Sequence, residues 1–342
     1  MEFRALVSAL AALLTVVAGF MGACLLAGVA MGEGLLPLRA FGTPMVLGLG
    51  LLAFAVLSRK LGGRPYLSPR TGYLFVVLGW VLSALLGAMP FVLSGAIASP
   101  IDAFFESMSG FTTTGASILN VIESLPRSIL LWRATTHWLG GMGIVVLTVA
   151  VFPLLGIGGR ALMEAEAPGP QVDKFTPRIS QTAKILWLIY LGLTVVLTLL
   201  LMLGGMDLFD AVTHSFATMA TGGFSTRNAS VAAFGSGYID VVITVFMFLA
   251  GMNFALHWRL LRGEFGNVFR DSELRVYAGI FLATSGLIAF DLVKAGTYAS
   301  GAEAGRYAAF QVSSILTTTG FATADYLFWP PDRKSTRLNS SH

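Results

Sequence analysis

The chain has 342 residues, of which 55% are hydrophobic and only 12% are charged, with a formal net charge of +4. Soluble domains carry about 25% charged residues, so this composition excludes a protein whose whole surface faces water. The sequence contains no basic helix interleaved with aromatic residues, which argues against nucleic acid as a partner. We expect a protein embedded in a lipid bilayer.

Apolar stretches follow one another along the chain, and about 20 apolar residues are enough for a helix to cross the hydrocarbon core. We expect about seven spans, at residues 5–32, 40–57, 73–97, 134–155, 185–203, 241–256 and 276–290. The first stretch is far longer than the apolar core of a signal peptide, so we expect it to be retained. The sequence thus predicts an all-α, multi-pass integral membrane protein.

Lysine and arginine gather in alternate loops between these spans. They are Arg59, Lys60, Arg64 and Arg70 after the second span, Arg160, Lys174, Arg178 and Lys184 after the fourth, and Arg259, Arg262, Arg270 and Arg275 after the sixth. Because positively charged loops stay on the cytoplasmic side, this pattern predicts a cytoplasmic N-terminus in a protein of the cell (inner) membrane.

Polar segments of about half a span each interrupt the apolar pattern three times, at residues 102–115, 210–223 and 307–320. Each segment ends in small hydroxyl residues and a glycine, which is Gly115, Gly223 or Gly320. Asp102 and Asp210 both stand thirteen residues before their glycine, which predicts that they are the N-caps of short helices. The repeating unit is therefore a span, a half-helix, a loop and a second span.

These segments have the properties of pore loops. Irregular backbone at membrane depth is tolerated only inside protein or along a water-filled cavity. A half-helix that ends in mid-membrane presents the negative end of its dipole there, which favours a cation. Backbone carbonyls of the following loop then replace the hydration shell of an ion, and the glycines allow the close backbone approach that this needs. The repeats predict most of a cation-conducting pore.

Other interpretations fit these three segments less well than a pore. A single such segment would be an ordinary external turn, but three in equivalent places favour a pore. A secondary transporter of another small solute, or of sodium, also uses broken helices, but it predicts inverted copies and charged substrate ligands. An intramembrane protease predicts a Ser/His or metal cluster, and neither GxSxG nor HExxH occurs, so we do not expect an enzyme.

The same segments resemble a known family. The sequences SGFTTTGAS (109–117), ATGGFST (220–226) and LTTTGFATAD (316–325) are similar to the first three filter loops of the Trk/Ktr/HKT superfamily of potassium transporters. HWLGGMGI (137–144) and GMNFALHW (251–258) resemble parts of the helices that follow the first two loops. The two spans before the first repeat are similar to the extra N-terminal pair of the TrkH/TrkG branch.

This resemblance implies four span–pore-helix–span repeats in one chain around a pseudo-fourfold axis. It implies that potassium is coordinated mostly by backbone carbonyls of three residues in each loop, namely Thr113, Thr114, Gly115, Thr221, Gly222, Gly223, Thr318, Thr319 and Gly320. The glycine at Gly115 favours potassium, because a serine there accompanies sodium transport in plant relatives. The resemblance also implies a homodimer and a cytosolic nucleotide-binding regulatory subunit.

The chain departs from this pattern after the third loop, because residues 326–342 contain no further span. Residues 333–342 resemble translated vector sequence, and we expect them not to belong to the fold. The expected organisation is two N-terminal helices with a basic loop (1–70), repeat 1 (71–160), a cytoplasmic linker with repeat 2 (161–262) and an incomplete repeat 3 (263–332). With three of four repeats, the chain alone is expected not to conduct selectively.

The histidines His137, His214 and His257 do not stand in equivalent places of the repeats, so they do not predict a metal site. Trp138 and Trp258 follow two of them, and we expect these His-Trp pairs to be anchors at the membrane interface.

Three further features lie outside the filter loops. Glu106 falls in the first half-helix, where a carboxylate needs a partner, and Arg133 or Arg127 is the expected one. The glycines of residues 140–143 predict close helix packing. The charged, proline-containing linker at 164–177 predicts a solvated segment or a docking surface for a regulator.

Overall fold

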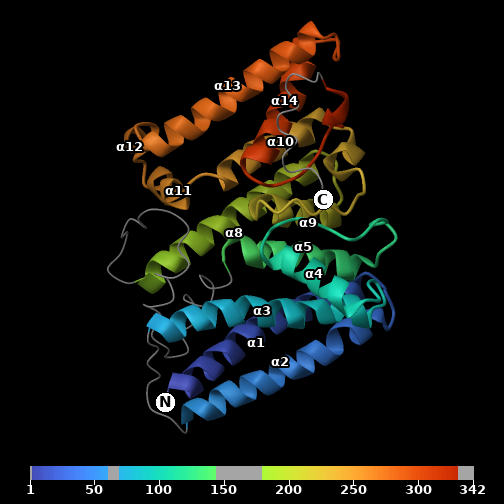
Figure 1. Cartoon of the computed structure of the whole chain (residues 1–342), viewed down its shortest axis with the longest axis vertical. Helices are drawn as coiled ribbons and strands as arrows, with labels where there is room; N and C mark the ends of the chain where they lie inside the picture. Colours follow the sequence, from blue (N-terminus) through green and yellow to red (C-terminus); the bar gives the residue numbers. More distant parts are fainter. Residues whose placement is uncertain (1, 61–68, 144–178, 330–342) are drawn as a thin grey trace. The chain divides into compact units, whose positions relative to one another are not determined.

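The computed structural model describes residues 2–60, 69–143 and 179–329 (Figure 1). These residues form α-helices, two short 3-10 helices and loops, and no β-strand occurs among them. Five of the helices are long and apolar enough to cross a membrane, at Phe3–Ala30, Leu36–Leu57, Thr71–Leu93, Ala183–Leu203 and Ser272–Lys294. The prediction of an all-α membrane protein is confirmed. The chain divides into two compact units, residues 1–113 with 124–190, and residues 114–123 with 191–342.

In the first unit three long helices lie side by side, α1 (Glu2–Ala30), α2 (Leu36–Lys60) and α3 (Pro69–Leu93) (Figure 1). Helices α1 and α2 approach closely because Gly48 of α2 has no side chain, and a Cβ there would overlap the Cβ of Ala18. Leu13 and Met21 of α1 are fully buried in this layer. The helices α1 and α2 are the predicted N-terminal pair, and α3 is the predicted first span of repeat 1.

Two shorter helices complete the described part of the first unit, α4 (Pro100–Phe111) and α5 (Arg127–Gly141). With 12 residues, α4 is about 18 Å long, roughly half the thickness of a bilayer core. It packs on α3 at Gly87, where a Cβ would stand 2.5 Å from Ser107 Oγ and 2.6 Å from Phe111 Cε2. Of the span predicted at 134–155, residues beyond 143 lie outside the described part of the chain.

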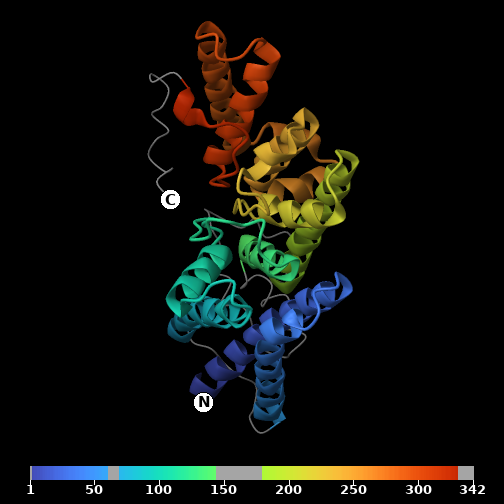
Figure 2. The same cartoon turned by 90° about the vertical axis from the view of Figure 1, so that its right-hand side faces the viewer.

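The second unit contains the other two half-helices. Its α-helices are the second half of α8 (Ile179–Leu203), α9 (Leu208–Met219), α10 (Gly237–Ala250), α11 (Phe254–Leu261), α12 (Phe265–Phe269), α13 (Ser272–Lys294) and α14 (Gly301–Leu316). The short 3-10 helices are η1 (Ser230–Phe234) and η2 (Tyr326–Phe328). Figure 2 shows α13 and α14 side by side. Leu292 of α13 and Ala304 and Ala308 of α14 belong to one buried cluster between them. The half-helices predicted in repeats 2 and 3 are α9 and α14.

The span predicted at 241–256 is not one straight helix. Helix α10 ends at Ala250, and α11 continues at 101° to it. A Cβ at Gly251 would lie 2.7 Å from the Tyr277 hydroxyl, so the glycine allows α13 to approach the turn. Asn253 then starts the new helix by accepting a hydrogen bond from the Ala255 N–H at 3.0 Å. The chain bends here because a close approach and a new N-cap follow each other within three residues.

Candidate functional site

Each half-helix starts with the same capping arrangement. The N-cap side chain accepts a hydrogen bond from the backbone N–H three residues later, at 3.3 Å in α4, 2.6 Å in α9 and 3.1 Å in α14. The pairs of N-cap and third helical residue are Ser99–Asp102, Asp207–Asp210 and Ser300–Glu303. The prediction that Asp102 and Asp210 are the N-caps is wrong, because the helices begin three residues earlier. At the third position a carboxylate is still favoured by the positive end of the helix dipole.

Each half-helix also ends in the same way, with a threonine in the left-handed region of backbone conformation. The φ angles are +53°, +52° and +58° at Thr113, Thr221 and Thr318. In α9 the Thr221 N–H bonds the Thr218 carbonyl at 3.0 Å, and the Gly222 N–H bonds the Ala217 carbonyl at 2.9 Å. In this Schellman arrangement glycine normally takes the left-handed position, and any other residue is strained there by about 1–2 kcal/mol. Such strain is kept where function requires it.

The three following loops share one backbone conformation. We name them loop 1 (112–126), loop 2 (220–229) and loop 3 (317–325). Two residues after the left-handed threonine comes a left-handed glycine, with φ of +77°, +78° and +85° at Gly115, Gly223 and Gly320. The residues between them, Thr114, Gly222 and Thr319, do not have positive φ. Residues with positive φ thus alternate with residues without it, and backbone turns of this kind can present several peptide groups to one ion.

The three loops converge at these glycines. A Cβ on Gly115 would overlap the carbonyl oxygen of Gly222 in loop 2. A Cβ on Gly223 would in turn overlap the carbonyl oxygen of Thr319 in loop 3. Gly320 has open space at the same place, with no described atom within 4 Å. The backbones of loops 1, 2 and 3 therefore follow one another head to tail, each glycine against a carbonyl of the next loop.

Loop 3 is also joined to η1, the segment that follows loop 2. The Ala232 N–H donates to the Ala322 carbonyl at 3.1 Å, and the Ala322 N–H donates to Ser230 Oγ at 3.2 Å. Within loop 3, the Phe321 carbonyl accepts a hydrogen bond from Ser314 Oγ of α14 at 2.7 Å. Loop 3 is thus held both by its own half-helix and by the segment that follows loop 2.

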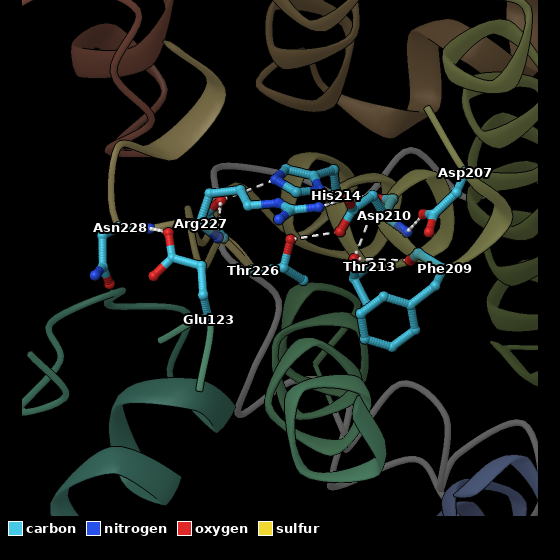
Figure 3. A network of polar contacts seen from close by, with 10 residues as sticks. Glu123, Asp207, Phe209, Asp210, Thr213, His214, Thr226, Arg227 and Asn228 are labelled. Carbon is cyan, nitrogen blue, oxygen red and sulfur yellow. Dashed lines mark hydrogen bonds and ion pairs between the residues drawn. The ribbon is translucent and has the colours of Figure 1, made fainter. Parts of the chain in front are cut away.

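A polar network surrounds the carboxylate of Asp210 on α9 (Figure 3). Thr226 Oγ1 donates to Asp210 Oδ1 at 2.6 Å, and Arg227 Nη2 lies 2.6 Å from Oδ2. One turn along α9, His214 Nε2 lies 2.9 Å from Ser225 Oγ. The Asp210 and His214 side chains of α9 therefore hold residues 225–227, in the second half of loop 2.

Loop 1 contacts loop 2 through Asn228. Its backbone N–H donates to Glu123 Oε1 at 2.7 Å (Figure 3). Its Oδ1 accepts from the Ile122 N–H at 2.9 Å. The hydrogen bond from the Asn228 N–H holds the pKa of the exposed Glu123 carboxyl below its ordinary value. Two hydrogen bonds, one from the backbone and one to the side chain of Asn228, thus fix loops 1 and 2 to each other.

The histidines are core residues. His137 and Trp138 are buried within the first unit, where Trp138 stacks on Tyr190 at 5.6 Å between ring centroids. His257 is buried too, with Nε2 2.9 Å from the Leu249 carbonyl. The expectation of interfacial His-Trp anchors is therefore wrong for both histidines, since the neighbouring helices cover them. Among the described residues no three metal-binding side chains come together.

The predicted partner of Glu106 is resolved in favour of Arg133. Arg133 Nε lies 2.6 Å from Glu106 Oε1, and both side chains are buried between α4 and α5. The predicted close packing at residues 140–143 occurs at Gly140, although the contact is with a helix end. A Cβ there would overlap the Phe111 carbonyl oxygen and would lie 3.0 Å from Thr113 Cγ2. Gly140 therefore lets α5 support the start of loop 1.

A family model named TrkH and described as a cation transport protein matches residues 57–277. The chain belongs to the TrkH family. The Trk system potassium uptake protein TrkH of Escherichia coli (strain K12) is 47% identical over 267 residues, which are 77% of this chain and 55% of that protein. TrkG of the same strain, also named a Trk system potassium uptake protein, is 38% identical over 77% of this chain and 55% of its own length.

A solved TrkH structure has the same fold. The crystal structure of the potassium transporter TrkH from Vibrio parahaemolyticus superposes with a TM-score of 0.79 at 36% identity, covering 96% of this chain and 68% of that one. The chain thus spans a little over half the length of the curated TrkH relatives described above. The resemblance to the Trk superfamily drawn from the loop sequences is confirmed by both comparisons.

Sequence reasoning missed the left-handed threonines and the network around Asp210. The motif ATGGFST does contain Ser225 and Thr226, so their hydroxyls were visible in the sequence. Their partners on α9, Asp210 and His214, stand 16 and 11 residues away, and only the fold brings them together.

Proposed function

We propose that this chain forms most of a potassium-uptake pore, in which backbone carbonyls of the three loops coordinate the ion. The residues assigned to coordination are those predicted from the sequence: Thr113, Thr114, Gly115, Thr221, Gly222, Gly223, Thr318, Thr319 and Gly320. The printed names of the TrkH and TrkG relatives, which are potassium uptake proteins, support potassium as the transported ion.

The proposal rests mainly on the contacts of two glycines. Gly115 and Gly223 each fit against a carbonyl oxygen of the next loop, at positions where a Cβ would overlap that oxygen. This close approach brings the backbones of the three loops together, as a filter that coordinates an ion with backbone carbonyls requires. The left-handed threonines before the glycines are strained, as expected if the direction of the carbonyls is maintained for function.

The half-helices supply the long-range electrostatics. Helices α9 and α14 both end at the residue before their loop, so their C-termini point toward the converging glycines. Each C-terminus carries about half a negative charge, which stabilises a cation without an ionised side chain. The pore therefore needs no buried carboxylate at the ion, and a dehydrated monovalent cation is the species that this arrangement favours.

We further propose the cellular setting of the pore. The positive-inside pattern supports a protein of the cell (inner) membrane with a cytoplasmic N-terminus. A homodimer and a cytosolic nucleotide-binding regulatory subunit are proposed from the family resemblance, and the relatives are named as parts of a Trk system.

The test is rubidium uptake by cells without potassium uptake of their own. They express a full-length version, in which the chain is extended to the length of its TrkH relatives. Gly115→Ser is expected to reduce the preference for rubidium over sodium, because the new side chain displaces the Gly222 carbonyl.

Gly95→Ser is the matched control, since Gly95 has the same φ of +77° but open space around it, outside the three loops. It is expected to retain the preference. Unchanged selectivity in Gly115→Ser, or equal loss in both variants, would refute the assignment of the filter.

A further inference from the structure

The segment Thr226–Asn228, which we name the return segment of loop 2, is held on one side by α9. The Asp210 carboxylate accepts a hydrogen bond from Thr226 Oγ1 and pairs with Arg227 through its other oxygen, both at 2.6 Å. Asp210 is only 5% exposed, whereas Arg227 is 43% exposed. The buried carboxylate therefore fixes two successive residues of the segment from the protein side.

On its other side the return segment holds loop 1. The Asn228 side chain accepts from the Ile122 N–H, and the Asn228 N–H donates to the Glu123 carboxylate (Figure 3). The chain path from Asp210 to loop 1 thus runs through three consecutive residues, each with a hydrogen bond or ion pair to another segment.

These hydrogen bonds lie close in sequence to the contact between Gly115 and the Gly222 carbonyl. Gly115 of loop 1 fits against the Gly222 carbonyl of loop 2, and Ile122 and Asn228 follow these residues by seven and six positions. A shift of loop 1 relative to loop 2 therefore moves Gly115 relative to that carbonyl. Carbonyl ligands discriminate between cations by their number and positions, so a shift of this kind alters selectivity before it unfolds the protein.

We propose that the return segment of loop 2 positions loop 1 and thereby sets the discrimination between potassium and sodium, with Asn228 and Glu123 as positioning residues. The inference rests on the proposed function as a potassium filter. In it the Glu123 carboxylate acts as a hydrogen-bond acceptor, and its negative charge is not required.

The experiment measures rubidium and sodium uptake separately in the full-length version. Asn228→Ala and Glu123→Ala each remove one hydrogen bond, and each is expected to lower the rubidium-to-sodium ratio by up to about fivefold, the net worth of one hydrogen bond. Asn228→Asp and Glu123→Gln keep an acceptor oxygen, and they are expected to restore most of the ratio. Exposed Asn120, whose side chain makes no hydrogen bond to the described part of the chain, provides the matched control Asn120→Ala.

The possible outcomes test the positioning role and the proposed function separately. Loss of the ratio in Glu123→Gln as large as in Glu123→Ala would show that charge matters, and it would overturn the positioning role. Equal loss of rubidium and sodium uptake in the alanine variants, with an unchanged ratio, would overturn it too, since that is a folding defect. A wild-type protein without preference for rubidium would instead refute the proposed function itself.

If an alanine variant does not reach the membrane, the thermal stability of the purified protein provides a second measurement. The melting temperature in potassium is compared with that in sodium, for wild type and for Asn228→Asp. Wild type is expected to be stabilised more by potassium than by sodium, and Asn228→Asp is expected to keep this difference. Its absence in Asn228→Asp would contradict the role assigned to the Asn228 oxygen.

Discussion

Arg133 and Glu106 form an ion pair of 2.6 Å between α5 and α4, and neither side chain reaches the surface. This pair fixes the first half-helix against the helix that follows loop 1. A buried pair contributes little compared with a well-packed apolar pair, but removal of one partner leaves a buried charge.

We therefore expect Glu106→Gln to lower the free energy of unfolding by about 3 kcal/mol. The double variant Glu106→Gln with Arg133→Met is expected to recover most of this loss, because no buried charge remains. Thermal unfolding in detergent measures both. A double variant less stable than the single one would contradict this account.

The left-handed threonine of loop 2 gives a prediction in which stability and function change in opposite directions. Thr221→Gly removes the strain of a β-branched residue at φ +52°, so it is expected to raise stability by about 1 kcal/mol. The same change frees the backbone, so the rubidium-to-sodium ratio is expected to fall. Thr221→Ala keeps the Cβ and removes only the hydroxyl, and it separates the two effects. Lower stability in Thr221→Gly than in wild type would count against strain at this residue.

Gly223 and Gly320 differ in surroundings, although both are left-handed. Gly223→Ala places a methyl group on the Thr319 carbonyl, whereas Gly320→Ala meets open space. In this chain Gly320→Ala is expected to cost only the conformational strain, about 1–2 kcal/mol, and Gly223→Ala clearly more. Denaturant or thermal unfolding of the two variants tests the difference. Equal losses would mean that loops 2 and 3 are not packed as described.

The bend between α10 and α11 depends on Asn253. Asn253→Ala removes the N-cap of α11 and is expected to lower stability by about 1 kcal/mol, while Asn253→Asp keeps the acceptor and is expected to be nearly neutral. Melting temperatures of the two variants are the measurement. Identical behaviour of both variants would show that the cap does not stabilise the bend.

The hydrogen bond from Asn228 to Glu123 gives the direction of a pH effect. Because folding lowers the pKa of Glu123, its contribution is complete above the ordinary pKa of about 4.3 and is lost as the pH falls through the lower folded value. The stability that this hydrogen bond contributes should therefore stay constant from neutral pH to about pH 5 and be lost only at more acidic pH. The rubidium-to-sodium ratio should change little over the whole range, because a protonated Glu123 keeps an acceptor oxygen, as Glu123→Gln does. The ratio can be measured over this pH range in reconstituted vesicles. Glu123→Gln should lack this loss of stability at acidic pH, and a fall of the wild-type ratio as large as that in Glu123→Ala would contradict the role of Glu123 as an acceptor.

Much of this architecture could be predicted from residue patterns. The half-helices were visible as polar segments that end in a glycine, because a re-entrant helix needs a short polar stretch between two apolar ones. Their starts were misplaced by three residues, since Asp102 and Asp210 are good caps and equally good third residues. Only the positions of Ser99 and Asp207 in the folded chain decide between the two.

The rest of the site depends on contacts between distant segments. Nothing local marks Asn228 as the partner of Ile122 and Glu123, which are more than one hundred residues away. His137 and Trp138 have the composition of an interfacial anchor, yet the helices that bury them are themselves apolar on several faces. A sequence pattern does not show which of those faces meet lipid and which meet protein.

The head-to-tail contact of the loops has a consequence for biosynthesis. Gly115 fits against a carbonyl of loop 2, and Gly223 against one of loop 3, so each loop is completed by a segment that the ribosome makes later. A nascent chain that has inserted only its first repeats therefore lacks these backbone contacts. Loops 1 and 2 can therefore reach their final packing only after loop 3 has been made.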